Sequence, residues 1–182
     1  MSLDAFLAPL EQPGVVPPLD HWRPPFLGDM DLCITADGQW VHEGRAIERP
    51  RLAQLLATLL WRDDDGDYYL VSPVEKWRIR VEDCPFVVVD ASAHDDDWIM
   101  TTNMADRVRL DASHPLMLSQ APAGECIPEV PVRFGLTARI NRNVYYHLIE
   151  HAERRASDDW IELGITSAGH WHSLGGLDRA SL

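Results

Sequence analysis

Apolar and polar residues alternate along most of this chain, which is the pattern of β-strands that bury one face. In the clearest run, 76–81, Trp77, Ile79 and Val81 are expected on the core side, and they alternate with cationic residues. Further strands are predicted at 32–35, 39–42, 68–72, 86–89, 98–101, 104–110, 116–119, 130–140, 160–166 and 171–174. Because the run 86–89 is apolar throughout, we expect that strand to be buried on both faces.

Two stretches repeat apolar residues at helical spacing instead. Leucines recur in this way between Pro50 and Arg62, and proline fits the first turn of a helix because its missing N–H is not needed there. Apolar residues follow the same spacing between Arg142 and Arg155, and Asn141 can cap the start of that helix. The sequence therefore predicts helices over 50–62 and 142–155.

The segments around these two helices resemble each other. Each helix follows an Ile-x-Arg triplet, 47–49 or 140–142, and precedes an acidic turn and an aromatic strand, 67–72 or 159–164. Asp37–Gly38 and Glu43–Gly44 predict tight turns before the first helix. We expect an α+β protein of two small domains, built from a duplicated strand–helix–hairpin unit with mostly antiparallel sheets.

The predicted domains are 26–93 and 94–182, and a proline-rich arm at 1–25 precedes them. Proline favours extended chain, and Trp22 is the expected anchor of the arm.

Composition narrows the classes of function. A net charge of −13 opposes binding to polymeric nucleic acid or to an anionic membrane surface. The three cysteines are far apart and form no CxxC pair, so neither a zinc site nor a disulfide framework is predicted. No apolar run is long enough to span a membrane, and the start lacks the features of a signal peptide. We expect a cytoplasmic protein without a metal or other cofactor.

Cationic side chains gather on two predicted strand faces. Lys76, the only lysine, shares one face with Arg78 and Arg80, and Arg133 and Arg139 share another, followed by Arg142 at a helix start. Guanidinium groups bind phosphate or carboxylate with two hydrogen bonds, so these faces are candidates for an anion site. The alternative is that these groups are paired with the abundant Asp and Glu residues.

Polar and aromatic neighbours complete the expected site. Ser72 and Glu75 precede Lys76, and because adjacency alone gives no catalytic geometry, we expect them to orient a ligand together with Asn103. Trp40 can stack on a planar ligand. No catalytic residue is predicted. The expected ligand-binding residues are Trp40, Ser72, Glu75, Lys76, Arg78, Asn103, Arg133, Arg139 and Arg142.

Two motifs have the spacing of metal sites. His147, Glu150 and His151 match an HxxEH pattern of zinc peptidases, but a third ligand must come from elsewhere, so a solvated helix face is favoured. The acidic stretch 63–67 is similar to a calcium loop, but Trp61 and Ser72 stand where carboxylate ligands are required. A solvated turn is the preferred interpretation.

Three segments of the chain form a recognisable combination, namely DGQWVHEGRAIERPRLAQLLATLLWRDDDGDYYLVSPVEKWRIRVEDCPFVVV, Met100–Asn103 and VPVRFGLTARINRNVYYHLIE. On these segments the chain resembles a bacterial family known as domain of unknown function 1285, and the resemblance covers about 29–175. Ser72 stands where threonine is expected, and Glu129 stands where an aromatic residue is expected. The resemblance implies two small domains with a duplicated core, a C-terminal domain similar to pleckstrin-homology folds, a site for a nucleotide-like ligand between the domains, and a role in signal transduction.

We therefore expect a cytoplasmic ligand-binding or regulatory protein whose partner is an anionic, nucleotide-like small molecule. One alternative is a small hydrolase that uses Glu75 or a metal site at His147 and His151. Another is a protein-interaction module that uses a sheet edge or the N-terminal arm. We favour a binding protein over an enzyme.

Overall fold

The computed structural model describes residues 15–120, 126–156 and 160–178. Its chain divides into two compact units, the first formed by Met1–Pro85 with Phe134–Leu136, and the second by Phe86–Arg133 and Thr137–Leu182. The main division therefore lies between Pro85 and Phe86, whereas the sequence pattern placed it after residue 93. The reason is that Phe86–His94 forms one continuous strand of the second unit.

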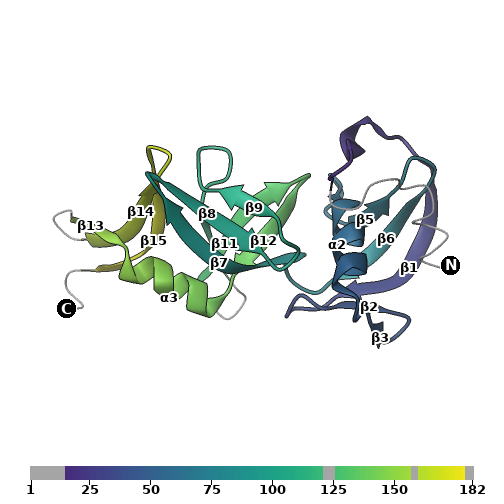
Figure 1. Ribbon diagram of the computed structural model, residues 1–182, viewed down its shortest axis with the longest axis horizontal. Helices are drawn as coiled ribbons and strands as arrows, with labels where there is room; N and C mark the ends of the chain where they lie inside the picture. Colours follow the sequence, from purple (N-terminus) through teal and green to yellow (C-terminus); the bar gives the residue numbers. More distant parts are fainter. Residues whose placement is uncertain (1–14, 121–125, 157–159, 179–182) are drawn as a thin grey trace. The chain divides into compact units, whose positions relative to one another are not determined.

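The first unit contains a six-stranded sheet with the order β3-β2-β1-β6-β5-β4 (Figure 1). Its elements are the 3-10 turn η1 (Leu19–His21), β1 (Phe26–Ile34), β2 (Trp40–His42), β3 (Arg45–Ala46), α2 (Pro50–Thr58), β4 (Leu60–Arg62), β5 (Tyr68–Val71) and β6 (Lys76–Val81). Only β1 and β6 run parallel, and the other neighbours in this sheet are antiparallel. Its core contains Ile34, Leu56 and Leu70, which are fully buried.

Both predicted turns of this unit are confirmed. Glu43 and Gly44 have positive φ angles of 49° and 74°, and they connect β2 to β3 with His42 opposite Arg45. Gly38 closes the turn between β1 and β2 with a φ angle of 84°. These backbone angles favour glycine, which is why the sequence signal was reliable.

Helix α2 begins at Pro50 as predicted but ends at Thr58. The next residues, Leu60 and Trp61, pair with Leu70 and Tyr69 in the sheet instead of continuing the helix. Pairing of this segment with β5 therefore overrides the helical spacing of the leucines.

The second unit contains a six-stranded sheet with the order β10-β11-β12-β7-β8-β9 and a three-stranded sheet with the order β13-β14-β15 (Figure 1). Its elements are β7 (Phe86–His94), β8 (Asp97–Thr102), β9 (Arg107–Arg109), β10 (Met117–Gln120), β11 (Cys126–Arg133), β12 (Leu136–Ile140), α3 (Arg142–Glu150), β13 (Glu153–Ala156), β14 (Trp160–Ser167) and β15 (His170–Asp178). Strands β7 and β12 run parallel.

The long strand predicted over 130–140 is in fact two strands, β11 and β12. Phe134 and Gly135 form the turn between them, with φ angles of 47° and 74°. Arg133 and Arg139 therefore lie on different strands and do not share one strand face. The alternation of apolar residues continues through Phe134, so it conceals the turn. The prediction of one continuous strand was therefore wrong.

Strand β7 continues to His94. The prediction that residues 86–89 are buried on both faces was wrong. Phe86 and Val88 are fully buried, but Val89 is 49% exposed. The pairing with β8 shifts between Val88 and Asp90, which is the mark of a β-bulge. An apolar run alone does not reveal such a shift.

Helix α3 confirms the predicted cap, because the Asn141 side chain accepts a hydrogen bond from the backbone N–H of Asn143 at 3.0 Å. The helix ends at Glu150 and not near Arg155, since Glu153–Ala156 forms β13 against β14.

The order of helix, short strand and hairpin recurs in the two units, as α2-β4-β5-β6 and as α3-β13-β14-β15. The protein is thus mostly sheet, with two α-helices and mostly antiparallel pairing in the described residues. In that part of the chain, no helix has the length and apolar character needed to span a membrane.

Candidate functional site

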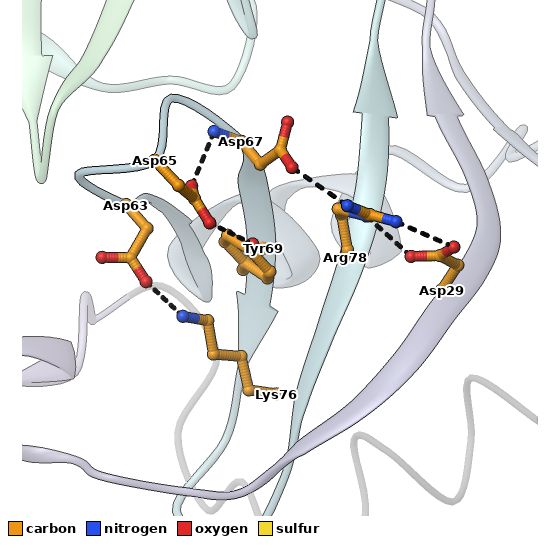
Figure 2. Close-up of polar contacts among 7 residues, drawn as sticks. All are labelled: Asp29, Asp63, Asp65, Asp67, Tyr69, Lys76 and Arg78. Carbon is orange, nitrogen blue, oxygen red and sulfur yellow. Dashed lines mark hydrogen bonds and ion pairs between the residues drawn. The ribbon is translucent and has the colours of Figure 1, made fainter.

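Arg78, in the centre of β6, is held by one carboxylate from the neighbouring strand β1 and one from the turn that precedes β5. Its Nε and Nη2 donate to the two oxygens of Asp29 at 2.7 and 3.1 Å, and its Nη1 donates to Asp67 at 3.1 Å (Figure 2). Strand β1 places Asp29 directly opposite Arg78. The hydrogen bond from Arg78 holds the pKa of Asp29 below its usual value, and the bonds from Arg78 to Asp29 and Asp67 raise the pKa of the guanidinium.

Lys76, two residues earlier on the same strand, has a second set of partners. Its ammonium is paired with Asp63 and lies 3.9 Å from the centre of the Tyr69 ring (Figure 2). The Lys76 side chain is 21% exposed. The hydrogen bond from Lys76, supported by the backbone N–H of Asp64, lowers the pKa of Asp63.

Tyr69 connects this pair to the acidic turn between β4 and β5. Its hydroxyl donates to Asp65 at 2.6 Å, and this hydrogen bond, together with burial, raises the pKa of Tyr69 to about 12. The turn itself is fixed by the backbone N–H of Asp67, which donates to the Asp65 carboxylate at 2.9 Å, and by the N–H of Gly66, which donates to Asp63 O at 2.9 Å.

The acidic turn was predicted only as a solvated loop. Three of its carboxylates instead serve different partners, namely Asp63 for Lys76, Asp65 for Tyr69 and Asp67 for Arg78 (Figure 2). The sequence shows these carboxylates, but it does not reveal which side chains they bind.

Two hollows open beside this cluster, both within the first unit. The first, of about 350 Å³, is here called the Lys76 hollow and is lined by Leu19, Asp20, Trp22, Arg23, Pro24, Trp61, Asp63, Asp64, Val71 and Lys76. The second, of about 510 Å³, is lined by Asp29, Met30, Gly66, Asp67, Tyr68, Arg78, Ile79, Arg80 and Val81. The Lys76 hollow has two indole rings and two cations among its walls.

The proline-rich arm forms one wall of the Lys76 hollow. Leu19 is buried at 2% exposure, and Trp22 is half-buried. Arg23 Nη1 donates to the carbonyls of Asp20 and Trp22, both at 2.7 Å, so the guanidinium is held beside the hollow by the backbone.

Ser72 and Glu75 are used by the turn before β6. The Ser72 hydroxyl is fully buried and accepts hydrogen bonds from the N–H groups of Val74 and Glu75 at 3.4 and 3.2 Å. Glu75 Oε2 accepts from the indole N–H of Trp77 at 3.1 Å. Both side chains fix the chain that leads to Lys76. Ile79 is buried as predicted, whereas Trp77 is only half-buried.

Trp40 is a core residue and not a stacking platform. It is 2% exposed, so neither face of its indole is open to a ligand. The sequence did not indicate this burial, because a three-residue strand gives little pattern to show which face lies in the core.

The other predicted site residues belong to the second unit. Asn103 pairs with the backbone of Val87 through its side-chain oxygen at 3.0 Å and through its N–H at 2.8 Å. Arg133 is paired with Asp106 and lies 5.1 Å from the centre of the Phe86 ring. Arg139 is half-buried on β12, and Arg142 is exposed at the first turn of α3.

The structure therefore brings Lys76 and Arg78 together on one face of β6, and it places Asn103 and Asp106, the partner of Arg133, in the same turn of the second unit. Pairing of the cations with carboxylates, the alternative considered above, holds for Lys76, Arg78 and Arg133. A single ligand site between the domains, formed by cations of both units, stays a prediction.

His147 and His151 pack against an aromatic ring. Their rings are 4.7 Å apart, and both lie edge-on to Trp98, at 5.9 and 5.6 Å. In the described residues, no three His, Cys, Asp or Glu side chains are placed to hold a metal ion.

Two buried polar residues of the second unit were missed. The Ser167 hydroxyl accepts from the N–H of Trp98 at 2.8 Å and donates to Leu110 O at 2.7 Å. His172 Nδ1 accepts from the N–H of Leu116 at 3.2 Å. Both join β14 and β15 to the other sheet, and burial lowers the pKa of His172. Apolar and polar residues alternate in their strands as in the others, so no pattern in the sequence marks this role.

Two family models match this chain, and their boundary lies close to the boundary between the two units. Residues 17–84 match the N-terminal domain of unknown function DUF1285, and residues 85–174 match the C-terminal domain of the same family. No curated protein matches the chain.

Two solved structures are similar. A DUF1285 family protein from Silicibacter pomeroyi DSS-3 is 34% identical, with a TM-score of 0.84 over 99% of this chain and 97% of that chain. A DUF1285 family protein from Shewanella baltica OS155 is 26% identical, with a TM-score of 0.55 over 66% of this chain and 91% of that chain. The predicted resemblance is confirmed, and the chain belongs to the DUF1285 family.

Proposed function

We propose that this protein binds a small, planar, anionic molecule of nucleotide-like chemistry in the Lys76 hollow of its first unit. The observation that carries the proposal is the ammonium of Lys76, which is largely covered by protein and lies beside a hollow walled by Trp22 and Trp61. The proposal places the ligand in the first unit and does not need the site between the domains that the family resemblance implies.

The cations of the hollow support the anionic part of the ligand. Lys76 brings three donors on a compact charge, and Arg23 brings a planar guanidinium that backbone carbonyls hold in place. A phosphate or carboxylate forms charge-assisted hydrogen bonds with groups of both kinds.

The indoles support the planar part. Trp22 comes from the N-terminal arm and Trp61 from β4, so the hollow has aromatic walls from two segments. Stacking of a base on an aromatic side chain is worth about 1–3 kcal/mol and tolerates different bases. The volume of about 350 Å³ falls within the range of small-molecule sites.

The carboxylates of the hollow define the donors that the ligand needs. Asp20, Asp63 and Asp64 all line it, and ionised carboxylates only accept hydrogen bonds. Ring amines or sugar hydroxyls can satisfy them, and a nucleotide carries such donors together with its phosphate. A simple anion lacks them.

A regulatory role in signal transduction in the cytoplasm belongs to the same proposal. A bound ligand would change the contacts of Trp22 and Arg23, because both residues line the hollow. A partner that contacts these two residues could therefore distinguish the ligand-bound protein from the free protein. A C-terminal unit similar to pleckstrin-homology folds fits such a role, and this similarity stays a prediction.

Calorimetric titration of the full chain with adenosine 5′-monophosphate, adenosine and inorganic phosphate tests the proposal. We expect the nucleotide to bind more tightly than either part alone. Lys76→Met should weaken nucleotide binding about ten-fold or more, since a charge-assisted hydrogen bond is worth roughly 1.5–3 kcal/mol.

Arg80→Met is the matched control. It removes one positive charge from the same strand, but Arg80 lines the other hollow, so nucleotide binding should remain close to that of the unmodified chain. Absence of nucleotide binding, or equal loss in the two variants, would contradict the proposal.

A further inference from the structure

Lys76 and Arg23, the two cations of the Lys76 hollow, are held in different ways. Arg23 donates to two backbone carbonyls, and in the described part of the chain no carboxylate forms an ion pair with it. Lys76 is paired with Asp63, which lines the same hollow. The positive charge of Lys76 is therefore already neutralised, whereas that of Arg23 is not.

We propose that Asp63 is an internal competitor for the anion position of the Lys76 hollow, so that the anionic group of a ligand must displace the Asp63 carboxylate from Lys76. This inference rests on the proposed function and adds a regulatory element to it. Asp63 then lowers the affinity of the hollow for an anion, because the ion pair with Lys76 must break before the anion can bind that amine.

The position of Asp63 suits a tethered competitor. Its backbone N–H donates to Asp67 O at 3.0 Å, and its Oδ1 accepts from the N–H of Asp64 at 2.9 Å. The carboxylate is thus kept close to Lys76 by the turn, and a tethered group competes at a high effective concentration. The hydrogen bond from Lys76 lowers the pKa of Asp63, so the competitor is charged at neutral pH.

The competition selects the ligand class. A phosphomonoester carries a charge of about −1.5 to −2 and three strong acceptor oxygens, whereas the competing carboxylate carries a single charge. A terminal phosphate therefore has an advantage over a ligand carboxylate in displacing Asp63. We expect adenosine 5′-monophosphate to bind where the analogue with a 5′-carboxylate does not bind measurably.

Removing the competitor should strengthen binding. We expect Asp63→Asn to bind adenosine 5′-monophosphate about five-fold more tightly in calorimetric titration, since a partly exposed ion pair of this kind is worth up to about that factor. Asparagine keeps a side-chain oxygen for the N–H of Asp64, so the turn retains its hydrogen bond.

Asp64→Asn is the matched control, because Asp64 lines the same hollow and the ion pair of Lys76 is made by Asp63. Both variants remove one negative charge from the hollow, so the difference between them isolates the release of Lys76. Equal gains in the two variants, or weaker binding by Asp63→Asn, would overturn the inference and leave the proposed function standing. Failure of every variant to bind the nucleotide would overturn both.

The reactivity of Lys76 gives a second measurement that does not depend on a ligand. Lys76 carries the only side-chain amine of the chain, so acylation at this residue can be followed by mass spectrometry without interference from other lysines. We expect faster acylation in Asp63→Asn than in Asp64→Asn, and protection of Lys76 by the nucleotide. Equal acylation rates would show that Asp63 does not hold the amine.

Discussion

The two units place their polar side chains in different ways. Around β6 the polar groups are charged, partly exposed and paired with side chains, as Lys76 is with Asp63. Where the two sheets of the second unit meet, Ser167 and His172 are buried and bond to the backbone. Charged pairs near water can exchange partners at low cost, whereas a buried group that loses its partner carries the full penalty. The first region therefore suits ligand exchange, and the second suits stability.

The largest expected effect of the comparison is at Ser167. Ser167→Ala leaves the N–H of Trp98 and the carbonyl of Leu110 without this partner in a buried site. We expect a loss of about 3 kcal/mol in the free energy of unfolding, measured in urea. Thr166→Ala, at an exposed neighbouring position, should change it by less than about 0.5 kcal/mol. A loss below about 1 kcal/mol for Ser167→Ala would break the comparison.

The next effect concerns pH and His172. Burial lowers the pKa of His172 below 6.5, the nearby charge of His170 acts in the same direction, and the backbone of Ser167 and the carboxylate of Asp111 oppose it. Because the folded state binds this proton less readily than the unfolded state, its contribution is present above pH 6.5 and is lost as the pH falls toward the folded value.

We expect the free energy of unfolding to fall as the pH drops below 6.5, because the unfolded state then binds the proton of His172 more readily than the folded state does. His172→Gln should remove most of this dependence, whereas His170→Gln, on the same strand but exposed, should keep it. A pH dependence that is the same in both variants would assign the effect to other groups.

A smaller effect is expected for the pair in the first unit. Lys76→Met removes the ion pair with Asp63, and we expect a loss of about 1 kcal/mol at low salt and less at high salt, because salt screens partly exposed charges. Urea unfolding at two salt concentrations measures this. A loss that stays the same at high salt would show that the pair behaves like the buried groups of the second unit.

The smallest effect is on the titration of one carboxyl. Asp29 is exposed, and the hydrogen bond from Arg78 keeps its pKa below 3.8. Carbon-detected NMR should show this value returning to about 3.8 in Arg78→Met. Arg80→Met is the control, because the hydrogen bonds to Asp29 come from Arg78, so the pKa of Asp29 should stay below its usual value in that variant.

The starts of elements could be predicted from the sequence because single residues determine them. Pro50 and Asn141 mark the helix starts, and Gly44 marks a turn, since each residue type has a backbone or capping preference of its own. The ends could not be predicted, because Leu60 and Trp61 fit a helix and a strand equally well. Their pairing with β5 decided between the two.

The candidate site was predicted only in part for a similar reason. The cations of β6 were visible as an alternating run, but their partners depend on strand pairing. Asp29 faces Arg78 because β1 and β6 are parallel neighbours, and no local pattern indicates which strands pair in this way. The arm residue Arg23 was missed because only the fold places it beside Lys76.

The parallel pairs have a consequence for how each unit folds. In each six-stranded sheet a parallel pair, β1 with β6 or β7 with β12, joins strands that are far apart in the chain. A hairpin can form from its own residues, but a parallel pair requires closure of the long segment between its strands, which costs more chain entropy and is slower. We therefore expect the hairpins of each unit to form early, and the parallel pairing that completes each sheet to form late. The position of Asp29 beside Arg78 depends on that late step.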